Sequence, residues 1–482
     1  MKTISVIGTG MGALSAAALL AKRGAKVRLF EQNYLPGGCT SSYWRKGFVF
    51  EAGATTLVGL DQGMPLAYLL KQIPVKLDAW PLDIPMQVHL PTGELVTRYR
   101  ALDQWIAEAE RVFGKAGQRA FWEYCYAISQ FVWDTSLKQL RFPPETMGDL
   151  LATISQAELK QIRFATLAFR NTTWLLKKFG LDTNELFCAF VDQQLLISAQ
   201  NYRDEVNALF GATALCYTNY GNYYMPGGLI NLVNPLLDFI QKMNGELHLR
   251  TKVEGVEPKG EGYTIHTNKG VWESDAVVFG IPLNNVVELM PSLKKSQQSK
   301  LLSSDKLYSA FQMGIGFKSS RSFACIHHQL HLMEPLEGFE AESVFVSLNN
   351  DMDTARCDKA GTRVMSVSTH IRHPETSQLP KQAIEQAIIR LLVSKGFFQE
   401  DEVVYYHSSS QHAWEKWTGR KYGFVGGYPQ YMNIKPWQMK GARLDGKGAY
   451  LCGDTAYPGQ GIPGTVLGGI IAFEKMKADG HV

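Results

Sequence analysis

The sequence predicts an α/β protein in which one nucleotide-binding domain is assembled from stretches far apart in the chain. Three observations carry this prediction: a strand, glycine-rich loop, helix and strand at residues 2–30, several short strands at 245–282, and a strand, Gly/Pro loop and helix at 448–476. The chain has 482 residues, which is longer than one hydrophobic core usually extends. We therefore expect at least one further domain.

The N-terminal stretch has the pattern of a Rossmann-like βαβ unit, "VIGTGMGALSAAALLAKRGAKVRLFEQ". Gly8 permits a tight turn, Gly10 lets a pyrophosphate approach the backbone, and Ala13 lets the helix pack close to the sheet. Glu31 ends the second strand, where a carboxylate accepts hydrogen bonds from ribose hydroxyls. The pattern predicts a dinucleotide cofactor held by Gly8, Gly10, Met11, Gly12, Ala13, Glu31 and Gln32.

The residues after this acid favour FAD over NAD. Pro36, Gly37 and Gly38 form a turn, and "GFVFEAG" then predicts a hairpin, where an NAD domain would continue with an ordinary βα unit. A chain that turns back over the cofactor is typical of FAD-binding domains of the glutathione-reductase type, although a plain β-turn would have the same residues. We expect non-covalent FAD, with contacts from Gly37, Gly38, Cys39 and Thr40.

Two later stretches complete the predicted cofactor site. Val253 lies on the first of the short strands at 245–282, in a position suited to the adenine. Asp454 follows the C-terminal strand and can bind ribityl hydroxyls, and a helix from about Thr465 directs its positive end at the flavin. Here we expect contacts from Val253, Gly453, Asp454, Gly461, Ile462 and Pro463.

The order of these stretches predicts the domain organisation. Residues 1–75, 215–285 and 416–482 would form the FAD-binding domain, and 76–214 with 286–415 an inserted α+β domain for substrate and membrane contacts. The net charge of +4 does not indicate nucleic acid, and the seven cysteines show neither a C-x-x-C pair nor metal-ligand spacing. With no leader or spanning segment in view, we expect a cytoplasmic protein without a metal.

Three motifs resemble the carotenoid desaturase and isomerase family, which includes phytoene desaturases and retinol saturase. They are the N-terminal loop with its Gly37–Gly38 pair, "MPGGLINLVNPL" at 225–236, and "GDTAYPGQGIPG" at 453–464; "WTGRKYGFVGG" at 417–427 is also similar. Two residues depart from the family pattern: Ala13 replaces a glycine, and Glu51 stands where an aspartate is usual. The resemblance implies an FAD-dependent oxidoreductase acting on a hydrophobic polyene.

The resemblance leaves the reaction open among desaturation, cis–trans isomerisation and retinol saturase-type reduction. The flavin would carry the chemistry, so no catalytic residue is assigned. An amine oxidase is the main alternative, but enzymes of that kind resemble one another in a lysine on the strand after the middle FAD stretch. Residues 310–316 contain no lysine, which weighs against amine oxidation. A flavin-binding scaffold without turnover is a further alternative.

Aromatic residues gather in three stretches that either line a substrate tunnel or belong to the core: 121–133, 217–224 and 397–407. Tunnel lining is favoured more for the first two than for the third. His412 and Asp192 are minor candidates for contacts to substrate, and a structural role is the stronger interpretation of both.

Residues 160–180 are the predicted membrane contact, since a polyene dissolves in the bilayer. The stretch has no acidic residue, and on one helix Arg163, Arg170 and Lys177 would share a face. Its apolar residues are Phe164, Leu167, Trp174 and Leu175. An ordinary amphipathic core helix is the alternative.

Overall fold

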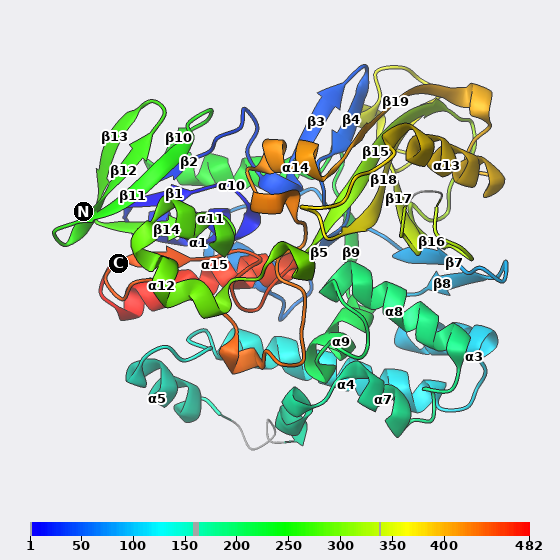
Figure 1. The fold of residues 1–482 in the computed structure, drawn as a ribbon, viewed down its shortest axis with the longest axis horizontal. Helices are drawn as coiled ribbons and strands as arrows, with labels where there is room; N and C mark the ends of the chain where they lie inside the picture. The colour runs from blue at the N-terminus through cyan, green and yellow to red at the C-terminus, as the bar shows by residue number, and fades with distance from the viewer. Residues whose placement is uncertain (1, 158–162, 337–338) are drawn as a thin grey trace.

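Two sheets organise the molecule, one on each side of its centre (Figure 1). The computed structural model describes residues 2–157, 163–336 and 339–482. A parallel sheet with its covering helices lies beside both chain termini, a larger mixed sheet lies at the opposite end, and a group of helices lies below (Figure 1). This arrangement is a mixed α/β fold, as the sequence predicts.

The five-stranded parallel sheet has the order β10-β2-β1-β14-β20. Its strands come from all three predicted stretches: β1 (Thr3–Ile7), β2 (Lys26–Phe30), β10 (Glu246–His248), β14 (Ala276–Phe279) and β20 (Ala449–Leu451). A three-stranded antiparallel sheet lies beside it, made of β11 (Val253–Lys259), β12 (Gly262–Thr267) and β13 (Gly270–Ser274). Val253 therefore begins the second strand of its stretch and not the first.

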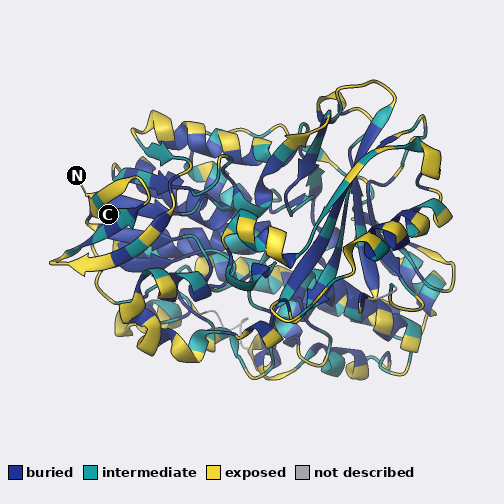
Figure 2. Cartoon of the chain, turned by 45° about the horizontal axis from the view of Figure 1, so that its top comes forward, coloured by how far each residue is buried: buried dark blue, intermediate teal, exposed yellow. Residues whose placement is uncertain are grey.

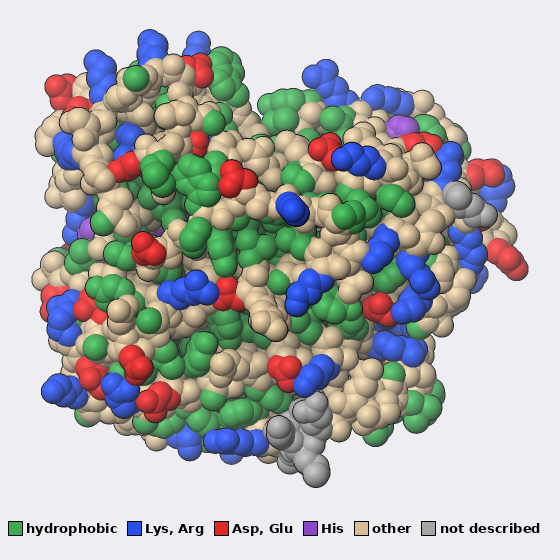
Figure 3. Space-filling model, turned by 180° about the vertical axis from the view of Figure 1, so that it is seen from behind, with side chains coloured by type: hydrophobic (Ala, Val, Ile, Leu, Met, Phe, Trp, Pro, Cys, Tyr) green, Lys and Arg blue, Asp and Glu red, His purple; other side chains and the backbone are tan. Residues whose placement is uncertain are grey.

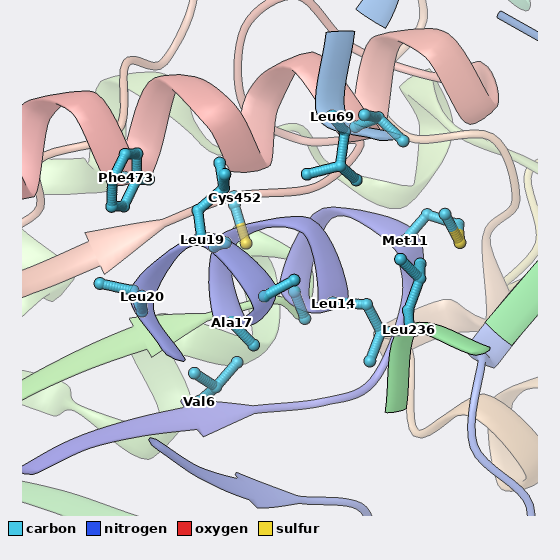
Figure 4. Packing of buried hydrophobic residues seen from close by; sticks show 14 of the residues in the cluster. Val6, Met11, Leu14, Ala17, Leu19, Leu20, Leu69, Leu236, Cys452 and Phe473 are labelled. Atoms are coloured by element: carbon cyan, nitrogen blue, oxygen red, sulfur yellow. The ribbon is translucent and has the colours of Figure 1, made fainter. Parts of the chain in front are cut away.

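Three helices pack on the parallel sheet: α1 (Met11–Lys22), α10 (Ile230–Lys242) and α15 (Gly461–Ala478). Every residue of α1 from Met11 to Ala21 is buried, with Leu14 between sheet and helices and Leu19 facing α15 (Figure 4). Small residues allow this approach, because a β-carbon on Gly469 would lie 2.3 Å from the carbonyl oxygen of Gly12. Helix α15 begins at Gly461, four residues before the predicted start at Thr465.

The seven-stranded sheet has the order β19-β15-β18-β17-β16-β7-β8. Its strands are β7 (Met86–His89), β8 (Leu95–Arg98), β15 (Tyr308–Lys318), β16 (His327–His331), β17 (Ser343–Leu348), β18 (Thr362–Arg372) and β19 (Val403–Ser409). Helix α13 (Lys381–Ser394) contributes Ile384 and Ile388 to the apolar core on one face. The long strands are largely buried (Figure 2).

The helical group covers part of the other face of this sheet. It contains α3 (Leu102–Phe113), α4 (Gln118–Lys138), α5 (Met147–Ser155), α7 (Thr172–Lys178), α8 (Glu185–Ala199) and α9 (Ala208–Leu215). Its core is rich in aromatic residues, including Trp105, Trp122, Phe187 and Phe190. The fully buried guanidinium of Arg98 lies 4.1 Å from the ring centroid of Trp105 and donates to Gln194 Oε1 at 2.9 Å.

Shorter elements connect these parts. They are the strands β3 (Ser42–Arg45), β4 (Phe48–Glu51), β5 (Leu57–Val58), β6 (Trp80–Pro81) and β9 (Asn222–Tyr224), and the helices α2 (Pro65–Gln72), α11 (Leu283–Leu289), α12 (Lys294–Gln297) and α14 (Gln411–Thr418). Strands β3 and β4 form the predicted hairpin. Among the described residues, no helix is long and apolar enough to cross a membrane.

The prediction of one amphipathic helix over residues 160–180 is wrong. Thr166–Phe169 form a 3-10 turn, Arg170 is extended, and α7 begins at Thr172. Lys160, at the start of the predicted segment, lies outside the described residues. The break arises because Asn171 bridges to Asn207 and accepts a hydrogen bond from the Trp174 amide at 3.0 Å, which starts a new helix. Phe164, Leu167 and Leu175 are buried in the helical core.

Candidate active site

A single large cavity of about 1640 Å³ connects the parallel sheet to the seven-stranded sheet. It exceeds the roughly 300–1,000 Å³ of an ordinary small-molecule pocket, so it has room for a dinucleotide and a second ligand. Of the predicted cofactor contacts, these line it: Gly8, Gly10, Met11, Gly12, Glu31, Gln32, Gly37, Gly38, Cys39, Thr40, Val253, Gly453, Asp454, Gly461, Ile462 and Pro463. The structure thus brings together residues more than 400 positions apart.

Parallel strands explain this convergence. Gly8 follows β1, Glu31 follows β2, Gly280 follows β14 and Gly453 follows β20 by one further residue. The carboxyl ends of parallel strands meet at one edge of a sheet, which is where α/β folds bind ligands. Each predicted loop therefore reaches the same end of the cavity.

Ala13 is the one predicted contact that does not line the cavity. It is fully buried in α1, and a β-carbon on Gly280 would lie 2.5 Å from its own. Its role is the close packing of helix on sheet that its position predicts, and no direct contact to a ligand is open to it. Gly12 is similarly constrained, since a β-carbon there would lie 2.8 Å from the backbone nitrogen of Gly453.

Glu31 is tied to the glycine turn through Thr9. The Thr9 hydroxyl donates to Glu31 Oε2 at 2.5 Å and accepts from the Gly37 amide at 3.0 Å, while the Asn33 amide donates to Glu31 Oε1 at 2.9 Å. Burial raises the pKa of Glu31, and these hydrogen bonds oppose that shift. The carboxylate is thereby held at the cavity wall, and Thr9 is a residue that the sequence reasoning missed.

Asp454 has a partner that the sequence did not predict. Arg420 Nη1 lies 2.9 Å from Asp454 Oδ2, and Arg420 Nε donates to the Phe424 carbonyl at 2.9 Å. Burial acts against the charge of Arg420, but Asp454, together with Cys39 and Tyr428, raises the pKa of the guanidinium. Arg420 belongs to the "WTGRKYGFVGG" motif, so the motif was visible although the role of its arginine was not.

Several buried polar atoms at the cavity wall have no hydrogen-bond partner among the described residues. They are Arg420 Nη2, Trp414 Nε1, Gln200 Oε1, Gln460 Oε1 and Thr56 Oγ1. Buried polar atoms are ordinarily satisfied, so a cluster of unsatisfied ones around a cavity indicates a polar ligand. Gln460 is also the N-cap of α15, whose free amides face the cavity.

The residues present fit FAD. Gly10 has no atom within 4 Å of where a β-carbon would stand, which leaves an open cradle at the start of α1 for a pyrophosphate. Glu31 can accept from ribose hydroxyls, and the unsatisfied donors and acceptors suit a polar ring system. Among the described residues, no group of three or more His, Cys, Asp or Glu could hold a metal.

The far part of the cavity is lined on one side by helices α4, α8 and α9. Phe131, Trp133, Phe210, Tyr217 and Tyr220 contribute aromatic surface there. Only parts of the predicted aromatic stretches therefore line the cavity. Phe121 and Trp122 lie in the helical core, Phe397 lies in the core of the seven-stranded sheet, and no residue of 397–407 lines the main cavity.

Two minor candidates lie elsewhere. His412 is exposed on α14, and Asp192 forms an ion pair with Arg203, whose backbone amide also donates to Asp192 Oδ1 at 2.9 Å. Neither residue lines the cavity. Their structural interpretation is therefore the better one. Glu51 is also structural: it is buried, pairs with Arg356 at 2.8 Å and accepts from the Ser42 hydroxyl at 2.5 Å.

The seven-stranded sheet closes the cavity with residues from β15, β17 and β18. Ala310 and Gln312 are the β15 side chains on this wall. The lysines that line the cavity among the described residues are Lys252, Lys416 and Lys421, and all three lie outside this sheet. Residues 310–316 of β15 contain no lysine, and Lys318 at the exposed end of the strand does not line the cavity, so the lysine expected of an amine oxidase is missing there, as the sequence indicates.

A parallel sheet whose strand ends converge on a dinucleotide cradle, joined to an apolar chamber, defines a cofactor-dependent oxidoreductase. Comparison with known proteins gives the particular family: residues 14–474 match the flavin containing amine oxidoreductases, and the chain belongs to that family. The protein is an FAD-dependent oxidoreductase.

Three curated relatives are similar over much of the chain. Prolycopene isomerase 2 of an Oncidium hybrid cultivar is 24% identical, with 98% of this chain and 83% of the relative covered. The 4,4'-diapophytoene desaturase of Staphylococcus aureus strain COL is 21% identical, with 99% of each covered. The all-trans-retinol 13,14-reductase of Danio rerio is 26% identical, with 72% and 57% covered. The resemblance to the carotenoid desaturase and isomerase family is thus confirmed.

Solved structures share the fold. An oxidoreductase from Methanosarcina mazei has a TM-score of 0.64 at 16% identity, with 98% of this chain and all of the other covered. A putrescine oxidase double mutant has a TM-score of 0.63 at 14% identity, with 99% of each covered. These likenesses confirm the predicted fold class and leave the substrate to be inferred from the site.

Proposed function

We propose that this FAD-dependent oxidoreductase acts on a hydrophobic polyene of the carotenoid type. The observation that carries the proposal is the continuous cavity, which joins the dinucleotide cradle to a chamber walled by Phe131, Trp133, Phe210 and Tyr217. A long apolar ligand needs such a chamber, and an amine would leave it largely unused. Bound FAD would supply the redox chemistry.

The residues of the chain would bind the cofactor, orient the polyene and shield the reacting bond from water. Gly8, Gly10 and Glu31 would hold the dinucleotide, with Asp454 and the amides of α15 at its other end. The aromatic wall would align the polyene and exclude water from the reacting bond. In this proposal residues 1–75, 215–285 and 416–482 form the FAD-binding domain, and 76–214 with 286–415 bind the substrate.

The test is expression in cells that make different carotenoids, followed by pigment chromatography. We expect a changed double-bond count or geometry in at least one pigment. A desaturase substrate should also bleach the oxidised flavin anaerobically, whereas a reductase substrate should reoxidise flavin that has first been reduced chemically. Desaturation, isomerisation and reduction give distinct products, so the same experiment chooses among them. Hydrogen peroxide release with primary or secondary amines, together with unchanged pigments, would favour an amine oxidase.

We further propose that the enzyme attaches to the membrane surface, because its substrate dissolves there. Helix α5 supports this with an apolar side that is turned outward: Met147, Leu150, Leu151 and Ile154 are 70, 38, 63 and 61% exposed. They lie at positions i, i+3, i+4 and i+7, on one side of the helix. The polar side of α5 faces inward, where buried Asp149 binds Arg141 at 2.9 Å and also pairs with Arg443. An ordinary surface helix has the reverse orientation.

The cavity reaches the molecular surface at exposed residues, one of which belongs to the helical group that contains α5. Ala165 and Trp437 line the cavity and are exposed, and the ring of Phe169, which is 61% exposed, lies 5.4 Å from that of Trp437. Figure 3 shows hydrophobic side chains and Lys or Arg side chains along the lower edge of the molecule, which is also the lower edge in Figure 1. Arg170 and Lys177 are exposed basic residues of the same helical group, just before and within α7. An anionic bilayer matches exposed apolar and basic side chains.

Vesicle co-sedimentation of the flavin-loaded enzyme tests this surface. We expect binding to anionic vesicles that weakens with salt, and about 1.5–3 kcal/mol less binding free energy for each apolar side chain removed from the inserted face. Leu151→Ser/Ile154→Ser should release the enzyme, and Val271→Ser/Met352→Ser, which alters exposed apolar residues elsewhere, should not. Equal release by both pairs, or no binding of the wild type, would contradict the proposal.

A further inference from the structure

The polar groups on the sheet wall of the cavity are unusual for an enzyme that acts on a hydrocarbon. Strands β15 and β18 pair in antiparallel register, with Gln312 opposite Ser368 and Ala310 opposite His370. The odd-numbered residues, such as Phe311 and Met313 on β15, face the apolar core of this sheet. The even-numbered Gln312, Ser368 and His370 face the cavity. We call these three residues the polar strip.

The polar strip lacks hydrogen-bond partners in the described part of the protein, although the ring of His370 packs edge-on against Tyr308. Among the described residues, no side-chain hydrogen bond is made by Gln312, Ser368 or His370, and all three are partly exposed toward the cavity. Phe345 of β17 pairs with Ser368 and lines the cavity beside it. Polar side chains in such a place are normally satisfied by protein, water or a ligand.

Several other polar residues in the same sheet bind protein groups, although Ser366, His327, His331 and His407 each keep one buried atom without a partner among the described residues. Ser343 donates to Gln193 Oε1 at 2.7 Å, Gln329 donates to the Gln193 carbonyl at 3.0 Å, and His327 contacts the Ser347 hydroxyl at 2.9 Å. Arg98, Gln194 and Gln329 form a further buried chain of hydrogen bonds. Ser343 and Thr369 also line the cavity but bind protein groups, so among the described residues of this wall Gln312, Ser368 and His370 are the polar side chains left to a ligand.

The strip is electrically neutral. The acidic and basic residues that line the cavity, among them Glu31, Lys252, Arg420 and Asp454, lie outside the seven-stranded sheet. Burial lowers the pKa of His370 to about 4, so its ring is uncharged near neutral pH and can both donate and accept. A carboxylate would find no cation at the strip, whereas a hydroxyl or carbonyl would find complementary donors and acceptors.

From this geometry we infer that the substrate carries an uncharged oxygen group, a hydroxyl or a carbonyl, which binds Gln312, Ser368 and His370. This inference rests on the proposed function and narrows the substrate class to oxygenated polyenes. A plain hydrocarbon would leave the strip unpaired, and sites built to bind an oxygen group discriminate strongly against ligands that lack it.

The experiment titrates the flavin-loaded enzyme with three polyenes of matched chain length: an alcohol, the hydrocarbon and the carboxylic acid. Binding is followed by flavin absorbance and fluorescence, so turnover is not required. We expect the alcohol to bind about tenfold more tightly than the other two. Tighter binding of the hydrocarbon or the acid would overturn the inference and leave the proposed function intact. Binding of none of them, whatever the chain length, would overturn both.

Two variants and a control locate the effect. Gln312→Leu and Ser368→Ala should each weaken alcohol binding about 3- to 10-fold and leave hydrocarbon binding unchanged. Ser366→Ala is the control, because Ser366 lies on the same face of β18 but outside the main cavity. If Gln312→Leu or Ser368→Ala loses FAD, or shifts the FAD absorbance before any polyene is added, the polar strip binds the cofactor and the inference is wrong.

Discussion

The two sheets meet one cavity in different ways. The parallel sheet reaches it with loops at the ends of its strands, and those loops carry charge: Glu31 follows β2, and Asp454 pairs with Arg420. The seven-stranded sheet reaches it with a face, and the side chains there are neutral, such as Gln312 and Ser368. The difference supports the proposal of two kinds of ligand, a charged dinucleotide at one end of the cavity and an uncharged substrate at the other.

The two sheets also differ in their buried titratable side chains. The seven-stranded sheet buries His327, His328 and His331 on one strand, each at most 5% exposed. Burial lowers their pKa values to about 3, 4 and 3, respectively. The partners of these rings are neutral, including the Ser347 hydroxyl, the Cys325 carbonyl and His89. Within the described ranges, no carboxylate raises the pKa of these rings.

Acid should therefore destabilise the protein through this sheet, and this is the largest effect we expect. The unfolded histidines bind protons below pH 6.5 and the folded ones do not, so stability is full above 6.5 and falls as the pH drops toward 4. Each ring contributes about 1.4 kcal/mol per pH unit, or roughly 4–6 kcal/mol for the three between pH 6.5 and 5. Thermal unfolding across this range measures it. An unchanged melting temperature would show that the rings are solvated.

Removing a charge from the cofactor end should have the next largest effect. Arg420→Met leaves the partly buried carboxylate of Asp454 without its partner, which costs at most about 3–5 kcal/mol of unfolding free energy. The double variant Arg420→Met/Asp454→Asn should recover most of this loss, because no charge remains unpaired. Denaturant unfolding of the apoprotein measures stability apart from FAD binding. A double variant no better than the single one would contradict the role of the pair.

The loops of the parallel sheet were easier to predict from the sequence than the cavity-facing side chains of the seven-stranded sheet. The cofactor loops were predictable because glycines at fixed spacing and an acid at a strand end are local signals, and all but Ala13 of the residues so identified line the cavity. The polar strip has no local signal, since Gln312 and Ser368 become neighbours only through the register of β15 and β18. Arg420 lies in a motif that was visible, but its partner is 34 residues away.

The predicted membrane segment shows another limit. Its spacing of basic residues fits one helix, yet the bridge between Asn171 and Asn207 ends that helix through a contact distant in sequence. Helix α5 was not predicted as a membrane contact, because an apolar face at helical spacing is ordinarily a core face. Only the burial of Asp149 on its other side shows that this face is turned outward.

Glu31→Ala should weaken FAD binding by about 1.5–3 kcal/mol, because it removes an acceptor for charge-assisted hydrogen bonds. The change also frees the Thr9 hydroxyl, which now links Glu31 to Gly37. Thr9→Val is a useful comparison, since it breaks the same link but keeps the carboxylate. Titration of apoprotein with FAD gives both affinities. If the two variants lose affinity equally, the loop position matters and the carboxylate does not.

Gly10 and Gly12, in the same N-terminal loop, provide the test with the smallest expected effect and the greatest selectivity. A β-carbon on Gly12 would lie 2.8 Å from the Gly453 nitrogen and 3.1 Å from the Thr465 carbonyl oxygen, so Gly12→Ala should cost about 1–3 kcal/mol of stability through overpacking. A β-carbon on Gly10 meets no atom within 4 Å, and Gly10 has φ −65 and ψ 167, which alanine adopts freely. Gly10→Ala should therefore change the stability of the apoprotein by less than about 1 kcal/mol, because the poorer N-cap of α1 is offset by the lower entropy of the unfolded chain.

The two variants should separate again when FAD is added. The open space at Gly10 faces the cavity, so its methyl group would occupy the cradle proposed for the pyrophosphate and weaken FAD binding directly. Gly12→Ala should weaken binding only as far as it shifts α1 against the loop after β20. Apoprotein melting and FAD titration, measured for both variants, distinguish packing from contact. If Gly10→Ala binds FAD like the wild type, the pyrophosphate does not approach the backbone at this residue, and the loop holds the dinucleotide through Thr9, Glu31 and Gly37 instead.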